Sequence, residues 1–213
     1  MHPDICQFIS EMAYEARLKA APENQTQRLA LPAAGGKLVR QDYGIVFSPV
    51  EHDGNTQGSD EEVARIQEIA GELIGRTLTN RDGKARPLTL LDILFVAPYN
   101  MNVRKLQDRF PDARVGSVDK FQGQEAPVVI VSMCSSAGEF GSRGLEFLLD
   151  KNRMNVAISP AKTLAIVVGD PRIATTQAGS VEQMEKLNLF CKLVQETSAQ
   201  PVHSKQTGKD AVL

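Results

Sequence analysis

The chain of 213 residues carries 24 Lys and Arg against 26 Asp and Glu, a formal charge of −2, and 42% of its residues are hydrophobic. This length suits one sizeable domain or two small ones, and it suffices to bury a core without disulfides or metal. The near-neutral balance excludes a protein that coats nucleic acid by bulk charge, although it is compatible with a local basic groove. No apolar run approaches the ~20 residues of a membrane span, and no secretory pattern opens the chain. We therefore expect no membrane partner.

The Cys and His residues do not suggest a metal site. Cys6, Cys134 and Cys191 are far apart in the sequence and odd in number, without the spacing of zinc ligands or of a secreted disulfide framework. We interpret them as small hydrophobic residues in a reducing, cytoplasmic protein. The histidines fall in predicted loops or termini, so we predict no metal site.

The first half of the chain predicts two helices and one strand. Residues 3–18 have an early Pro and apolar residues three to four apart, which is typical of a helix. Residues 21–42 are irregular, and 44–48 read as a short strand. Residues 59–62 (SDEE) form a capping box ahead of a second helix. Since 51–72 carry seven acids and one Arg, we expect an acidic, solvated face there, with nucleic-acid contacts elsewhere.

The second half predicts a layered α/β domain. Residues 92–97, 128–132 and 164–168 are continuous apolar runs, which favour parallel strands covered on both faces. Helices are predicted between them, near 102–110 and 148–158, and a last helix begins at a capping box, Ser180 to Gln183. Strands alternating with helices give a mostly parallel sheet in a single three-layer domain, residues 1–196. We expect a polar, disordered tail over 197–213.

Motifs for independent nucleotide hydrolysis are missing from this chain. It has no GxxxxGK[S/T], GxGxxG or GxSxG, and Gly35-Gly36-Lys37 lacks the required spacing and a preceding strand. We therefore expect no free-standing ATPase. In a parallel sheet, ligands bind beyond the carboxyl ends of the strands, which directs attention to the loops after Ala97, Ser132 and Val168.

Three segments together carry a family resemblance: 96–103 (VAPYNMNV), 115–131 (VGSVDKFQGQEAPVVIV) and 151–170 (KNRMNVAISPAKTLAIVVGD). In order and spacing they resemble motifs IV, V and VI of superfamily 1B helicases, the class of the nonsense-mediated-decay helicase and of bacterial relatives, some fused to a RecB-like nuclease. Residues 1–10 resemble the end of that family's YRMHP segment, so 1–20 would be a helix leading in from the preceding motif. The resemblance covers about half of the chain.

The resemblance implies a RecA-like fold and the role of second motor domain in an ATP-dependent DNA helicase. In such motors ATP lies between two RecA-like domains, and the first domain holds the P-loop and the Mg²⁺ ligand. ATP and Mg²⁺ would then bind only together with the missing first domain, and this chain alone would bind neither. The implied partners are single-stranded or duplex DNA and the first motor domain.

The resemblance assigns nucleotide contacts to Gly123, Glu125 and Arg153. Glu125 matches the family's nucleotide-contacting acid, and its alternative is a surface carboxylate. Gly123 would permit close backbone approach, or it serves the turn alone. Arg153 matches the first arginine of motif VI, and its alternative is an ion pair on a helix surface.

The strongest departure from the family pattern is Pro160. The family usually has T/S-R-A-K where this chain has Ser159-Pro160-Ala161-Lys162, so proline occupies the arginine-finger position. Proline has neither charge nor donor, and loss of such an arginine typically costs about 10³–10⁵ in rate. Lys162 is expected to point elsewhere. The Tyr-Arg that precedes the matching Met in the family is absent from the chain, so no complete catalytic set is predicted.

The resemblance assigns nucleic-acid contacts to five residues of motifs IV and V: Pro98, Tyr99, Asn100, Ser117 and Asp119. Short polar groups at strand ends suit phosphate contacts. Tyr99 would stack on a base or pack the strand-to-helix turn. Asp119 would alternatively be an N-cap for a turn at 120–122. The Gly/Ser-rich loop 134–144 reads as a mobile cleft loop, as the resemblance suggests, or as a plain connection.

Two functions follow from these residues. One is the second motor domain, not self-sufficient for ATP hydrolysis. The other is a truncated or degenerate, non-catalytic remnant that keeps a nucleic-acid or protein-binding surface, which Pro160 and the missing segment before Met1 favour. We expect DNA rather than RNA only because the motifs resemble those of bacterial DNA helicases.

Overall fold

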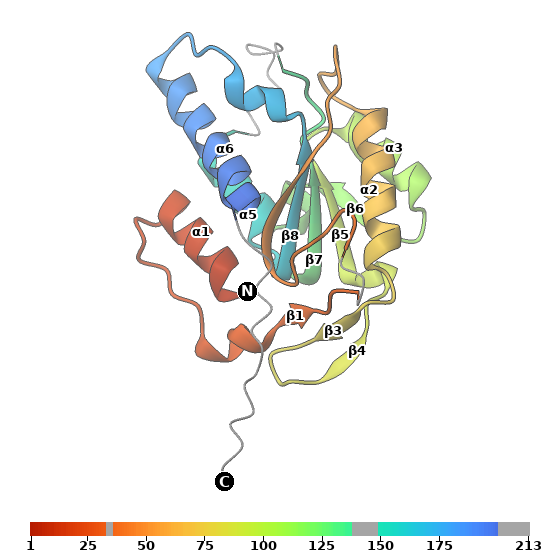
Figure 1. The fold of residues 1–213 in the computed structure, drawn as a ribbon. Helices are drawn as coiled ribbons and strands as arrows, with labels where there is room; N and C mark the ends of the chain where they lie inside the picture. Colours follow the sequence, from red (N-terminus) through yellow and green to blue (C-terminus); the bar gives the residue numbers. More distant parts are fainter. Residues whose placement is uncertain (33–35, 138–148, 200–213) are drawn as a thin grey trace.

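A computed structural model describes residues 1–32, 36–137 and 149–199 (Figure 1). Its centre is a five-stranded parallel sheet with the order β2-β8-β7-β5-β6. The strands are β2 (Gly44–Pro49), β5 (Ile93–Ala97), β6 (Arg114–Ser117), β7 (Ala126–Ser132) and β8 (Ala161–Gly169). The predicted strands are confirmed, and β6 is an additional edge strand.

The helices cover both faces of this sheet. Helices α1 (Pro3–Ala13), α5 (Lys151–Ile158) and α6 (Val181–Ala199) lie on one face, and α2 (Asp60–Leu73) and α3 (Asn100–Arg109) lie on the other (Figure 1). The side chains of β5 alternate between the two hydrophobic clusters, with Leu94 and Val96 in one and Ile93 and Phe95 in the other. Because both faces are buried, the strand has no polar alternation, and the predicted three-layer α/β class is confirmed.

Two helix boundaries differ from the prediction. Helix α1 ends at Ala13 rather than Leu18, because the chain turns back on Ser10: its carbonyl accepts from Tyr14 and Ala16, and its hydroxyl accepts from the amide of Leu18. At the other end α6 continues to Ala199, so the predicted tail is helical over 197–199; residues 200–213 lie outside the described part. Within the described residues no helix is long and apolar enough to cross a membrane.

A small antiparallel sheet, which was not predicted, lies next to the ends at which the parallel strands begin. We call this side of the main sheet the amino edge and the opposite side, where the strands end, the carboxyl edge. The strands of the small sheet are β1 (Arg28–Leu29), β3 (Thr77–Thr79) and β4 (Ala85–Pro87), in the order β1-β3-β4. The β3–β4 turn is stabilised by Asn80, whose side-chain oxygen accepts from the amides of Asp82 and Lys84. These strands are only two or three residues long, too short for a periodic sequence signal. Short 3-10 turns complete the description: η1 (Pro22–Thr26), η2 (Leu90–Asp92), η3 (Asp119–Phe121) and η4 (Pro171–Thr175).

Candidate nucleotide and nucleic-acid sites

Residues of three separate motifs meet at the amino edge of the sheet. The Glu125 carboxylate, just before β7, pairs with the Lys162 ammonium at 2.8 Å, just inside β8. The amide of Ala126 donates to the carbonyl of Pro160 at 3.0 Å, and the amide of His2 donates to the carbonyl of Lys162 at 2.7 Å. The N-terminal segment, motif V and motif VI are therefore neighbours in space. Lys162 faces Glu125, in contrast to the expectation that it points elsewhere.

This edge has the charges and the space for contacts with an anionic ligand. The hydrogen bond from Lys162 lowers the pKa of Glu125, so its carboxylate is ionised at neutral pH. A cavity of about 440 Å³ opens beside Lys162 and is also lined by Gln27, Lys84 and Arg86. Within the described residues no group of three or more His, Cys, Asp or Glu side chains is arranged to hold a metal ion.

Of the other predicted nucleotide contacts, Gly123 lies in the turn that leads to this edge, whereas Arg153 lies toward the opposite, carboxyl edge, near Asp119 and Tyr99. Gly123 has φ +78°, a left-handed conformation that favours glycine. A Cβ built there meets no atom within 4 Å, so the backbone conformation, rather than lack of space, accounts for the glycine. The guanidinium of Arg153 on α5 lies 3.7 Å from the carboxylate of Asp119, which joins motif VI to motif V. Pro160 is buried, and its ring presents no donor to the edge.

The predicted nucleic-acid contacts lie at the opposite, carboxyl edge. Pro98 and Tyr99 follow β5, and Asn100 begins α3 with an exposed side chain. The hydroxyl oxygen of Tyr99 is buried, and desolvation, with the nearby Cys134 thiol, raises its pKa. These facts favour packing of the turn by Tyr99 over stacking on a base. Ser117 ends β6, half-buried.

Asp119 is not the N-cap that was predicted as its alternative role. It lies within η3, whose N-cap is Val118 and has no side-chain capping bond. The Asp119 side chain instead faces Arg153. Sequence alone placed the cap one residue late because it could not show how the chain turns after β6.

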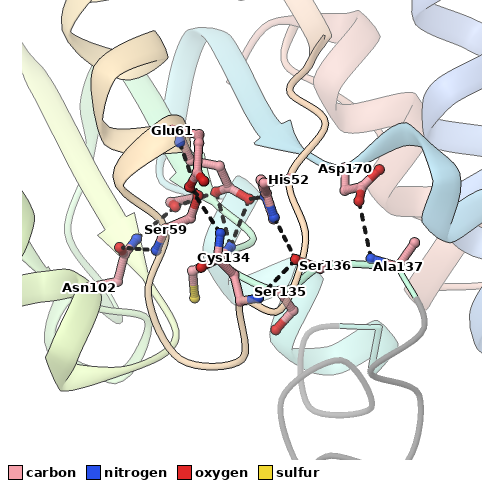
Figure 2. A network of polar contacts seen from close by, with 12 residues as sticks. His52, Ser59, Glu61, Asn102, Cys134, Ser135, Ser136, Ala137 and Asp170 are labelled. Atoms are coloured by element: carbon pink, nitrogen blue, oxygen red, sulfur yellow. Dashed lines mark hydrogen bonds and ion pairs between the residues drawn. The ribbon is translucent and has the colours of Figure 1, made fainter.

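A buried polar network occupies the carboxyl edge, and Figure 2 shows His52, Asn102 and Cys134 within it. The centre of the network is Glu62 of α2, which is fully buried. Both carboxylate oxygens of Glu62 accept from the amide of Cys134, at 3.0 and 2.9 Å. One oxygen also accepts from His52 Nε2 at 2.9 Å, and the other from the hydroxyl of Ser132. A carboxylate with 0% exposure is thus supplied with three donors, as burial of a charge requires.

The imidazole of His52 is part of this network. Desolvation lowers the pKa of His52, but the hydrogen bond and charge of Glu62, with the charges of Asp170 and Glu61, outweigh it and raise the pKa overall. The other ring nitrogen lies 2.8 Å from the hydroxyl of Ser136. This Ser–His–Glu chain is not a hydrolase triad, because Ser136 is fully buried and its oxygen already accepts from the amide of Asn55.

A second carboxylate, Asp170 at the end of β8, holds the same segment. It accepts from the amide of Ala137 at 3.1 Å and from the guanidinium of Arg172, which also donates to the carbonyl of His52. Residues 134–137 are therefore held at both ends by hydrogen bonds to buried carboxylates (Figure 2). The rest of the loop, 138–144, lies outside the described residues.

The acidic helix α2 has the solvated face that was predicted, with Asp60, Glu61 and Glu68 exposed, but Glu62 departs from it. Ser59 is the N-cap as expected, but the Glu62 side chain points into the core, and the amide of Ser59 donates to Asn102 instead. The sequence did contain a signal: Glu62 precedes Ile66, Ile69 and Leu73 by four, seven and eleven residues, on the buried stripe. Basic residues of α3 contact this helix, including Lys105, which pairs with Asp60 at 2.6 Å.

Asn102 was also missed by the sequence reasoning, and the same signal was available. It lies one turn before Leu106 on the buried side of α3 and is fully buried. The cysteine prediction is confirmed for burial: Cys6 and Cys134 are buried, Cys191 is half-buried, and all are free thiols.

Comparison with known proteins gives the family. Residues 1–172 match the family model described as "AAA domain". The chain is 29% identical over 82% of its length to mov-10-B.1 of Danio rerio, which is named as a helicase. It is 29% identical over 83% to the Regulator of nonsense transcripts 1 homolog of Drosophila melanogaster, and 27% identical over 84% to the DNA-binding protein SMUBP-2 of Mesocricetus auratus. It spans 19%, 15% and 18% of these relatives. Since the family model covers most of the chain, this protein belongs to the AAA-domain family and is a superfamily 1 helicase-like domain.

Proposed function

We propose that this chain is the second motor domain of an ATP-dependent helicase and acts together with a P-loop domain. The observation that carries the proposal is the meeting of residues 1–2, 123–126 and 160–162 at one edge of the sheet, through the Glu125–Lys162 ion pair and two backbone hydrogen bonds. Three segments that are far apart in the sequence form one surface there. A surface of this kind suits one wall of a nucleotide cleft.

The residues at this wall fit contacts to a nucleotide that another domain holds. The Glu125 carboxylate is ionised and 61% exposed, so it can accept hydrogen bonds from ribose hydroxyls. Lys162 supplies positive charge for phosphate oxygens. ATP with Mg²⁺ supplies the phosphoryl group and the charge neutralisation, and we assign their binding to the P-loop domain. Closure of the two walls would exclude water and couple hydrolysis to movement on the strand.

We propose single-stranded DNA as the ligand of the carboxyl edge, at Pro98, Asn100 and Ser117. Ser117 ends β6, Pro98 and Asn100 come just after the neighbouring strand β5, and Asn100 is exposed. The support for DNA is the motif resemblance. The names of the relatives refer to DNA in one case, to transcripts in another and to RNA in two. Competition between DNA and RNA oligonucleotides of one sequence tests this choice.

The test of motor function uses Pro160→Arg together with a P-loop domain from a superfamily 1 helicase. The chain alone should not hydrolyse ATP. In the mixed system, Pro160→Arg should raise DNA-stimulated turnover by about 10³-fold or more, because a guanidinium would reach the charge that develops on the γ-phosphoryl group. Pro160→Gln is the matched control, since it also removes the ring but adds no charge.

Two results would contradict the motor proposal. Turnover by the chain alone would show that the P-loop domain is unnecessary, and equal turnover of the Arg and Gln variants would show that position 160 does not face the phosphates. The second result favours the non-catalytic remnant, for which the buried Pro160 is the specific observation.

A further inference from the structure

The backbone at the end of β7 adopts a conformation that its residue disfavours. Cys134 has φ +48°, in the left-handed region, although it has a side chain. Such a conformation is unfavourable for a residue with a side chain and persists only where its neighbours restrain it. The bond from the Cys134 amide to both oxygens of Glu62, and the bond from Ala137 to Asp170, supply that restraint.

We propose that Glu62 is a positioning residue for strand binding: it fixes the turn 133–137 and ties this turn to the start of α3. This inference rests on the proposed function, because these two segments lie at the edge to which we assign the nucleic acid. No contact between Glu62 and the strand is involved, because the carboxylate has 0% exposure.

A continuous hydrogen-bond chain connects Glu62 to motif IV. The Ser132 hydroxyl donates to Glu62 and accepts from the side-chain amide of Asn102 at 2.7 Å. The Asn102 carbonyl oxygen accepts from the amide of Ser59 at 3.1 Å. Asn102 lies in the first turn of α3, two residues after the exposed Asn100. The end of β7 and the start of α3 therefore share one buried anchor (Figure 2).

The charge of Glu62 matters, because its two oxygens serve three donors. A glutamine has one acceptor oxygen, so the Cys134 amide, the Ser132 hydroxyl and His52 Nε2 would compete for it. A buried donor left without a partner is costly, and the strained turn would relax. The side-chain volume stays the same, which allows Glu62→Gln to fold.

His52 makes the anchor sensitive to pH. The groups that face it are Glu62 and Glu61 of α2, Asp170 after β8, Ser136, and Arg172, which binds its carbonyl and is itself paired with Asp53. Protonated His52 donates from both ring nitrogens, to Glu62 and to Ser136. Above its raised pKa the ring loses the positive charge that faces Glu62, and the ring nitrogen next to Ser136 then accepts from the Ser136 hydroxyl instead of donating to it.

The experiment compares wild type, Glu62→Gln and the control Glu68→Gln, an exposed glutamate on the same helix. Amide hydrogen exchange reports the turn, and fluorescence anisotropy with a labelled single-stranded oligonucleotide reports binding. We expect Glu62→Gln to speed exchange at Cys134 about tenfold, with Ile130 in the middle of β7 unchanged, and to weaken binding about tenfold. Wild-type affinity should fall as pH rises through the pKa of His52, and Glu62→Gln should flatten this profile.

Each outcome decides a separate point. Unchanged exchange at Cys134 in Glu62→Gln overturns the positioning role, whether or not the chain binds DNA. Faster exchange with unchanged affinity, in a chain whose wild type binds, shows that the turn does not serve the strand and also overturns it. A wild type that binds no oligonucleotide refutes the proposed strand site instead, and exchange alone then decides whether Glu62 holds the turn.

Discussion

Glu62 shows how one side chain departs from the rule that acids lie on the surface. Its helix is acidic in its first turn, yet Glu62 is fully buried and shares its oxygens among a histidine, a serine and a backbone amide. A buried ion pair adds little net stability, but removal of one partner leaves an uncompensated charge. The Glu62 carboxylate is therefore required for stability, because its buried partners have no other acceptor.

Replacement of Glu62 by alanine should lower the free energy of unfolding by about 3–5 kcal/mol, because His52 and the Cys134 amide would lose their acceptor inside the protein. Urea denaturation at pH 7 measures this change. Glu68→Ala on the same helix is the matched control and should stay within about 0.5 kcal/mol, since Glu68 is exposed. Equal losses in the two variants would show that the network does not hold α2 against β7.

At the scale of elements, the β3–β4 hairpin is held by an ion pair to the turn before β5. Arg86 donates two hydrogen bonds to Asp92, at 2.6 and 2.5 Å, and the amide and hydroxyl of Thr89 donate to the same carboxylate. The bonds from Arg86 are the main reason that the pKa of Asp92 falls from 3.8 to about 2. The small sheet is thereby joined to the amino edge of the main sheet.

The depressed pKa of Asp92 predicts a loss of stability in acid. The contribution is present above pH 3.8, where the unfolded carboxyl ionises, and is lost as pH falls through about 2. Arg86→Gln should remove about 1 kcal/mol of this pH-dependent stability. This is less than the full pKa shift would give, because solvent screens the half-exposed Arg86. Unfolding free energies at pH 6 and pH 2.5 measure it. If the unfolding free energies at pH 6 and pH 2.5 differ by the same amount in wild type and in Arg86→Gln, the Arg86–Asp92 ion pair is not the source of the loss of stability in acid.

At the scale of the whole molecule, the two proposed surfaces occupy opposite edges of one sheet. The predicted loops after Ala97, Ser132 and Val168 do gather polar groups at the carboxyl edge, but Glu125 and Pro160 precede β7 and β8 and lie at the amino edge. The rule that ligands bind beyond the carboxyl ends therefore describes one of the two surfaces. The length of the strands separates the two surfaces, so changes at each should act independently.

Glu125→Gln tests this separation. It should change the unfolding free energy by less than about 1 kcal/mol, because its ion pair with Lys162 is exposed. It should leave oligonucleotide binding by the chain unchanged, while it raises the ATP concentration needed for half-maximal turnover with a P-loop domain. A loss of oligonucleotide binding in Glu125→Gln would show that the two edges are coupled or that their assignments are reversed.

The sequence by itself determined the layered α/β class. The apolar runs at 93–97, 128–132 and 164–168 have no polar face, and only burial on both sides satisfies them. The capping residues Ser59 and Ser180 likewise located two helix starts, because they bond to amides within three residues of themselves. Local chemistry sufficed for these features.

Only the tertiary structure decided which residues meet. Glu62 contacts Cys134 across 72 positions of sequence, and Glu125 meets Lys162 from a different strand. Strand order and crossovers set these distances, and neither periodicity nor capping encodes them. The same holds for the left-handed turn at Cys134: a residue with a side chain adopts that conformation only because two buried carboxylates, from α2 and from the end of β8, hold the segment that it begins.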